Sequence, residues 1–97
     1  MPALTRQGDN CTGHDACPPR PLATGSPNVI VNDKGAGRVS ADIYAAHGCD
    51  AHAPHSAVIA SGSSNTFING FPAGRVDDPV SCGGNVAEGS PNVFVGG

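Results

Sequence analysis

The sequence predicts a small all-β domain in which a short β-hairpin recurs along the chain. Two observations predict this class: one segment repeats, and short apolar runs are bounded by turn-forming residues. The chain has 14 Gly and 9 Pro among 97 residues, roughly twice the usual share. It has only 2 Leu, 4 Ile, 9 Val and 3 Phe, so its apolar core is small. We therefore expect a metal, disulfides or a partner to stabilise it.

The repeat is ungapped and has an offset of 37 residues. Residues 25–41 read GSPNVIVNDKGAGRVSA and residues 62–78 read GSSNTFINGFPAGRVDD, with eight identical positions. A third copy starts at Gly89 as GSPNVFVGG. Three segments of the form Gly-Ser-x-Asn thus mark three equivalent units.

Each of the first two copies predicts one hairpin. The first strands are the β-branched or aromatic runs 29–31 and 66–68. Asn69-Gly70 follows the second run directly, and both residues tolerate the positive φ of a tight turn, while residues 32–35 are a looser turn. The predicted second strands are 37–39 and 74–76. The third copy supplies only a first strand, 93–95.

The segments between the hairpins give weaker signals. Residues 41–47 are compatible with one or two helical turns or with an irregular loop. The Pro-rich segment 18–21 predicts an extended entry to the first hairpin.

Composition excludes several functional classes. The chain has 5 Lys+Arg against 8 Asp+Glu, so it lacks the basic footprint of a nucleic-acid-binding protein. No apolar run approaches the length of a membrane span, and the first 25 residues lack the apolar core of a signal peptide. The motifs of nucleophile-elbow hydrolases, zinc proteases and P-loops are absent. We predict no catalytic residues and no enzymatic activity.

Cysteines and histidines are the candidate stabilising residues. Cysteines occur at 11, 17, 49 and 82, and histidines at 14, 47, 52 and 55. His55 and Cys82 each lie seven residues before a Gly-Ser, so two zinc-competent side chains hold the same place in successive repeats. Three interpretations stay open: a structural zinc held by His14, His47, His55 and Cys82, surface histidines with free thiols, or disulfides. Four protein ligands would leave zinc no open position for catalysis.

Each arginine of the repeats is followed by a carboxylate. Arg6 precedes Asp9, Arg75 precedes Asp77 and Asp78, and Arg38 precedes Asp42. We expect structural pairing of each arginine with a carboxylate or with loop carbonyls, rather than contacts to a partner.

Taken together, these segments resemble the PAAR-repeat proteins, which form the conical tips of type VI secretion spikes and of related contractile phage tails. The resemblance covers nearly the whole chain. The segments that carry it are 6–9, 13–15, 18–21, the three Gly-Ser-x-Asn hairpins, 82–84 and 89–97. The tetrads that correspond to Pro-Ala-Ala-Arg depart from it: they read Gly-Ala-Gly-Arg at 35–38 and Pro-Ala-Gly-Arg at 72–75.

The resemblance implies a conical all-β fold of short hairpins with pseudo-threefold repeats and a structural Zn²⁺ near the tip. By position, the zinc ligands are His14, His47, His55 and Cys82, and His52 has no matching role. It also implies one PAAR-repeat domain over residues 1–97 without a fused effector.

The implied function is mechanical. One tip monomer caps a trimeric VgrG-type β-helical spike, sharpens it for piercing a target membrane that it contacts only transiently, and carries effectors or adaptors. The protein would be assembled in the bacterial cytoplasm and leave it through the type VI machine. A phage baseplate tip and a small zinc hydrolase are the alternatives.

Overall fold

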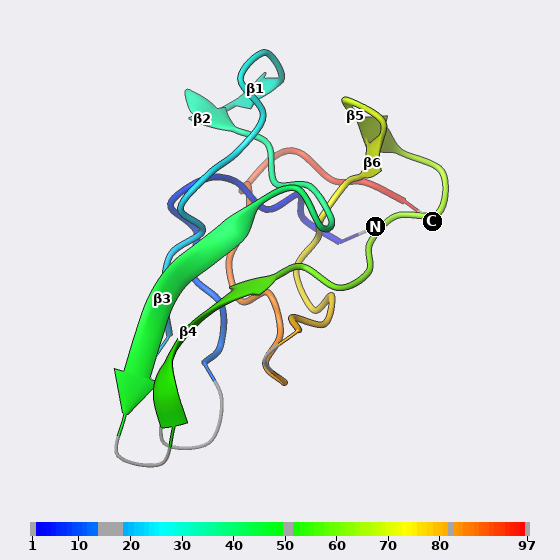
Figure 1. The fold of residues 1–97 in the computed structure, drawn as a ribbon. Helices are drawn as coiled ribbons and strands as arrows, with labels where there is room; N and C mark the ends of the chain where they lie inside the picture. Colours follow the sequence, from blue (N-terminus) through cyan, green and yellow to red (C-terminus); the bar gives the residue numbers. More distant parts are fainter. Residues whose placement is uncertain (1, 14–18, 50–51, 82, 97) are drawn as a thin grey trace.

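The computed structural model describes residues 2–13, 19–49, 52–81 and 83–96 (Figure 1). All regular structure among these residues is β, which confirms the predicted class. The strands are β1 (Ile30–Val31), β2 (Lys34–Gly35), β3 (Ile43–Cys49), β4 (His52–Val58), β5 (Phe67–Ile68) and β6 (Phe71–Pro72). They form three antiparallel hairpins, β1–β2, β3–β4 and β5–β6. The molecule measures 37 × 24 × 23 Å, and the β3–β4 hairpin reaches one end of it (Figure 1).

The hairpins β1–β2 and β5–β6 begin at the predicted strands and turn through two residues. Asn32 and Asp33 have φ of 53° and 66°, and Asn69 and Gly70 have φ of 54° and 84°. Two consecutive residues with positive φ match the right-handed twist of the flanking strands. Because the turn is so short, pairing restarts at once, so the second strands are β2 and β6 and not 37–39 and 74–76 as predicted.

The third repeat is completed by the beginning of the chain. Ala3 pairs with Phe94 in an antiparallel bridge. Leu4 N–H donates to Val93 O at 3.0 Å, and Val95 N–H donates to Pro2 O at 3.0 Å. The segment 2–4 therefore takes the place that β2 and β6 have in the other repeats, and it supplies the second strand that the third copy itself lacks.

A closed cycle of backbone hydrogen bonds joins the three repeats. Thr5 N–H donates to Gly74 O (3.0 Å), Gly74 N–H to Gly37 O (3.0 Å), and Gly37 N–H to Thr5 O (2.9 Å). These three residues hold equivalent places, so the fold has internal pseudo-threefold symmetry. We call this cycle the waist. We give the name base half to the hairpins of the three repeats: 26–36, 63–73, and 90–96 paired with 2–4. The core of the base half contains Leu4, Val31, Ala36, Ile68 and Ala73.

On the other side of the waist lie three further hairpins, which we call the apex half: 9–12 with 20–23, β3 with β4, and 79–81 with 84–87. They close into a ring. The bridges that join neighbouring hairpins are Leu22–Tyr44, Ile59–Val80 and Cys11–Val86, while Asn10–Pro21 and Pro79–Asn85 lie within two of the hairpins. A closed ring leaves its strand edges paired. The ring encloses the second core cluster, formed by Cys11, Leu22, Val39, Tyr44, Ala57, Ile59, Val80 and Val86.

Residues 41–47 contribute to a long strand, and both the helical and the loop interpretation were wrong. The buried Tyr44 pairs with Ala57 of β4 on one side and with Leu22 on the other. This pairing over long sequence distances outweighs the local helical tendency of Ala45 and Ala46. Of the Pro-rich segment 18–21, Pro18 lies outside the described residues, and Pro21 pairs with Asn10 in an antiparallel bridge, which agrees with the extended conformation predicted there.

Candidate functional site

Two of the four predicted zinc ligands lie on β3 and β4. His47 and His55 are direct partners in the antiparallel register of these strands, and Cys49 is opposite His52. The register shifts on either side of the His47–His55 pair, which marks a local irregularity in the ladder. His14 and Cys82 lie outside the described residues. The fold thus brings two predicted ligands to one place on the backbone of the apex half.

Cys11 belongs to the core and not to a disulfide. Its thiol is free and buried among the apolar side chains of the apex half. The backbone N–H of Arg20 approaches its Sγ at 3.5 Å. For this cysteine the structure selects the free-thiol interpretation.

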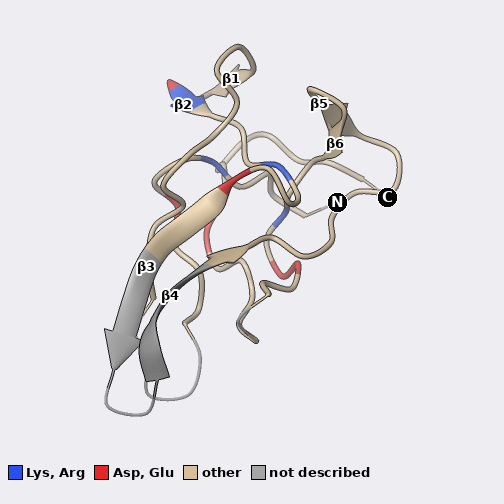
Figure 2. Cartoon of the chain, viewed as in Figure 1, with Lys and Arg blue, Asp and Glu red and all other residues tan. Residues whose placement is uncertain are grey.

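The three arginines form bidentate ion pairs with the three carboxylates, which confirms the structural role predicted for them. In each pair the arginine Nε and Nη2 donate to the two carboxylate oxygens at 2.8–3.1 Å, and the arginine backbone N–H donates to one of them as well. The pairs are Arg6–Asp9, Arg38–Asp42 and Arg75–Asp78. Figure 2 shows segments of Lys or Arg close to segments of Asp or Glu in the middle of the fold.

Asp42 is the most enclosed of these carboxylates. It is fully buried and accepts four hydrogen bonds, three from Arg38 and one from the Thr24 hydroxyl at 3.0 Å. The hydrogen bonds from Arg38 to Asp42 raise the pKa of that guanidinium, and those from Arg6 to Asp9 raise the pKa of Arg6. Paired groups of this kind hold backbone in place and offer a substrate no free charge.

Each arginine also connects two repeats. Arg6 Nη1 donates to Asn32 Oδ1 at 3.1 Å, and Arg38 Nη1 donates to Asn69 Oδ1 at 3.3 Å, so each reaches the turn of a neighbouring hairpin. The hydroxyl of a Gly-Ser-x-Asn serine donates to the same acceptor: Ser90 to Asn32 and Ser26 to Asn69, both at 2.6 Å. The turn asparagines therefore fasten one repeat to the next.

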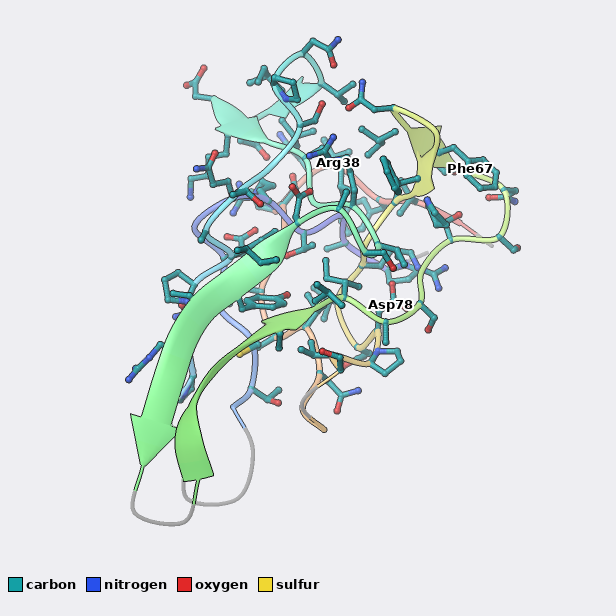
Figure 3. All side chains as sticks on the ribbon, viewed as in Figure 1. Arg38, Phe67 and Asp78 are labelled. Carbon is teal, nitrogen blue, oxygen red and sulfur yellow. The ribbon has the colours of Figure 1, made fainter. Side chains whose placement is uncertain are left out.

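In the third repeat a backbone carbonyl takes over this role. Position 96 is a glycine, and its carbonyl oxygen accepts from Ser63 Oγ at 2.6 Å and from Arg75 Nη1 at 3.1 Å. The same network therefore closes around the fold without a third turn asparagine. Arg38 and Asp78, members of two of the ion pairs, are labelled in Figure 3.

The Gly-Ser-x-Asn motif has a structural explanation at its glycine and at its serine. A Cβ at Gly62 would collide with Ala73 O and lie 2.7 Å from Val39 Cγ2, and Gly25 and Gly89 are similarly crowded by the opposite strand. The serine Oγ accepts from the backbone N–H three residues later at 3.0 Å in all three copies. The motif is therefore a loop that binds its own backbone and the adjacent hairpin.

The sequence indicated all three units of this symmetry, but only the first strand of the third. The prediction did not recognise that Ala3-Leu4-Thr5-Arg6 belongs to the third unit and is equivalent to residues 35–38 and 72–75. The shared spacing of Arg6–Asp9 and Arg75–Asp78 was the available signal.

Comparisons with known proteins agree with this architecture. The model of the PAAR motif family matches residues 50–97. A double-stranded DNA deaminase toxin A from Burkholderia cenocepacia (strain H111) is 41% identical over 76 residues, which cover 78% of this chain and 5% of that protein. The NAD(P)(+) glycohydrolase toxin Tse6 from Pseudomonas aeruginosa PAO1 is 39% identical over 82 residues, which cover 78% of this chain and 19% of the toxin. The (p)ppApp synthetase toxin Tas1 from P. aeruginosa UCBPP-PA14 is 39% identical over 82 residues, with 78% and 18% covered. The chain thus spans between about a twentieth and a fifth of these relatives.

Proposed function

This chain is a PAAR-repeat protein, and we propose that it acts in the type VI secretion spike as a structural tip. In this proposal one copy caps the blunt end of a trimeric VgrG-type β-helical spike and sharpens it. The observation that carries the proposal is the internal pseudo-threefold symmetry, which the backbone cycle of Thr5, Gly37 and Gly74 defines.

A monomer with three equivalent units can match a threefold-symmetric partner. Each unit of the monomer then meets one subunit of the trimer in about the same way, so one copy saturates the end of the spike. The buried ion pairs and the short turns give a rigid body, which reduces the entropy lost on binding. A tip of this kind also covers strand edges at the end of the spike, which would otherwise pair with other chains.

We assign no catalytic activity to this chain. The toxin activities in the names of the relatives belong to proteins of which this chain matches a small part. We propose that the shared part is the carrier of a toxin and not the toxin itself. Effectors would reach the spike joined to such a domain or bound to it.

For the apex we propose a structural Zn²⁺ held by His14, His47, His55 and Cys82. The antiparallel register pairs His47 directly with His55, which supports their sharing one ion. Three imidazole nitrogens and one thiolate are a normal tetrahedral zinc set. In this role the ion would tie β3–β4 to the two neighbouring hairpins, and four protein ligands argue against a zinc hydrolase.

Among the described residues no helix is long and apolar enough to cross a membrane. We propose that the chain assembles with the spike in the cytoplasm and leaves the cell with it. Its contact with the target membrane would last only for the passage.

The test is binding to a purified trimeric VgrG-type spike protein. We expect a complex of one chain per three spike subunits by light scattering with size-exclusion chromatography. Absence of a complex, or one chain bound per subunit, would contradict the proposal.

A further inference from the structure

The turn between β5 and β6 contains the residue pair in which an asparagine is chemically least stable. Asn69 alone among the asparagines of this chain is followed by glycine. Gly70 has no Cβ to shield its backbone nitrogen from the neighbouring side chain, and the space beside it is open. Both residues are exposed, and β5 and β6 lie far from the end of the β3–β4 hairpin (Figure 1). Water can therefore reach both groups of this pair.

The reaction that such a pair undergoes is deamidation. The Gly70 nitrogen loses its proton and bonds to Cγ of Asn69, the Cγ–Nδ2 bond breaks, and ammonia leaves, so that a succinimide ring is formed. Water then opens the ring. Cleavage of the new bond at Cγ gives aspartate, and cleavage at the main-chain carbonyl carbon gives isoaspartate, in which the chain runs through the former side chain. In sum, one water is consumed and one ammonia is released.

In the folded chain the Asn69 amide is held in place by hydrogen bonds at both of its ends. Its Oδ1 accepts from Ser26 Oγ at 2.6 Å and from Arg38 Nη1 at 3.3 Å. Its Nδ2 donates to Asn28 Oδ1 at 2.9 Å. To close the ring, Cγ must turn toward the Gly70 nitrogen and Nδ2 must leave, so the bond to Asn28 breaks and the other two are distorted. The three hydrogen bonds therefore oppose cyclisation.

The equivalent positions of the other two repeats are much less reactive. In the turn between β1 and β2, Asn32 is followed by Asp33, whose side chain hinders the approach to its backbone nitrogen. In the third repeat the acceptor of the network is the main-chain carbonyl of Gly96, which has no amide side chain. The junction that Asn69 makes with the first repeat is therefore the one most open to this chemistry.

We propose that Asn69 is a deamidation site that the folded chain protects and that opening of the β5–β6 turn exposes. The products would then record that the turn has opened. Aspartate at this position keeps an acceptor for Ser26 and Arg38 but loses the donor to Asn28. Isoaspartate adds one carbon to the main chain of a two-residue turn, so the turn no longer fits the twist of the two strands.

The first test follows deamidation of the full chain at mildly alkaline pH. Tandem mass spectrometry of the tryptic peptide 39–75 locates the modified asparagine and identifies isoaspartate. We expect the chain unfolded in urea to react at least about tenfold faster than the folded chain, in which hydrogen bonds of the amide must break first. Equal rates would show that the fold gives no protection and would overturn the proposal. A faster reaction in the folded chain would overturn it too, because Ser26 and Arg38 would then stabilise the oxyanion that forms on Oδ1.

Matched serine variants separate protection by this network from protection by global stability. Ser26→Ala removes the bond to Asn69, and Ser63→Ala removes the equivalent bond to Gly96 O, both of 2.6 Å. Both serines are buried and hold the same place in their repeats, so the two changes should cost similar stability. We expect folded Ser26→Ala to deamidate about two- to tenfold faster than folded Ser63→Ala, the factor that one lost hydrogen bond gives.

Equal acceleration in the two variants would mean that only global unfolding admits the reaction, and the protective role of the Asn69 network would be refuted. Urea unfolding of both variants checks that their stabilities match. If either variant does not fold, the comparison of the folded and unfolded wild type still decides, since it needs no substitution.

Discussion

Arg75 donates a hydrogen bond from Nη1 to the carbonyl oxygen of Gly96 at 3.1 Å. In the other two repeats the corresponding arginine reaches a side-chain oxygen, of Asn32 or Asn69. The acceptor at this equivalent position is thus a side-chain oxygen in two repeats and a backbone oxygen in the third. What the network requires is an oxygen at this point, and two repeats obtain it from a residue that also tolerates the positive φ of the turn.

Substitution of Asn69 by glycine separates these two requirements. Glycine keeps the turn, but it removes the oxygen that accepts from Ser26 and Arg38. We expect Asn69→Gly to lower the free energy of unfolding by about 1–3 kcal/mol, measured in urea. Asp33→Gly is the matched control, because Asp33 also has a positive φ and its side chain is exposed. Equal losses in the two variants would show that the network adds nothing beyond the turn.

Asp42→Asn tests the buried ion pairs. The change keeps the shape of the side chain but leaves the Arg38 guanidinium without its counter-charge in a largely buried site. Breaking a buried pair by removing one partner costs about 3–5 kcal/mol, so the melting temperature should fall sharply. The same chemical change at the exposed Asp33 should cost less than about 0.5 kcal/mol. A loss below about 1 kcal/mol at Asp42 would mean that the pair is dispensable.

Gly62→Ala tests the first position of the Gly-Ser-x-Asn motif. Its φ is not in the left-handed region, so the cost comes from the collision of the new methyl group with Ala73 O and Val39 Cγ2. Because the first of these is backbone, the strands must separate, and we expect a loss of about 2–4 kcal/mol by thermal or urea unfolding. Ser61→Ala, one residue earlier and exposed, should change stability by less than about 0.5 kcal/mol. Similar stabilities for the two variants would refute the steric explanation.

The zinc proposal predicts a sharp difference among the histidines. We expect about one Zn²⁺ per chain by inductively coupled plasma mass spectrometry. His14→Ala and Cys82→Ser should each lose the ion and show a large fall in thermal stability. His52→Ala is the control within the same hairpin and should retain the metal. If His52→Ala lost zinc while His55→Ala kept it, the ligand assignment would be wrong.

The repeat, the first strands and the Asn-Gly turn could be predicted because they depend on local chemistry. Residues 29–31 and 66–68 are strand formers, and positive φ selects residues such as Asn69 and Gly70. The sequence predicted a structural role for each arginine and left carboxylates and loop carbonyls open as partners; the structure shows ion pairs over three or four residues.

The rest depends on contacts between distant segments. Ile43–Cys49 became a strand because Leu22 and Ala57 flank Tyr44, and a reading of residues 41–47 by themselves contains neither neighbour. The N-terminal segment completes the third repeat although about 90 residues separate Ala3 from Phe94 in the sequence. Of the candidate zinc site, sequence spacing suggested the ligand set, and the cross-strand placement of His47 and His55 emerged only from the register.

Circular permutation tests whether the third repeat is equivalent to the others. Its hairpin is formed by the two chain ends, whose Val95 N–H and Pro2 O are joined by a hydrogen bond of 3.0 Å. A short Gly-rich linker between the ends would act as the missing turn, and new ends could then open the turn between Asn69 and Gly70. We expect this permutant to fold with the circular dichroism spectrum of the wild type, because the second hairpin would then be held as the third is now.

The control permutant opens between Gly74 and Arg75. There the cut interrupts the waist, where Gly74 bonds both Thr5 and Gly37, and separates Arg75 from the residue whose position it helps to fix. We expect this chain to be unfolded or to melt far below the first permutant. If both permutants unfold alike, the chain ends are not equivalent to a hairpin turn. The three repeats would then have the same geometry but would not contribute equally to stability.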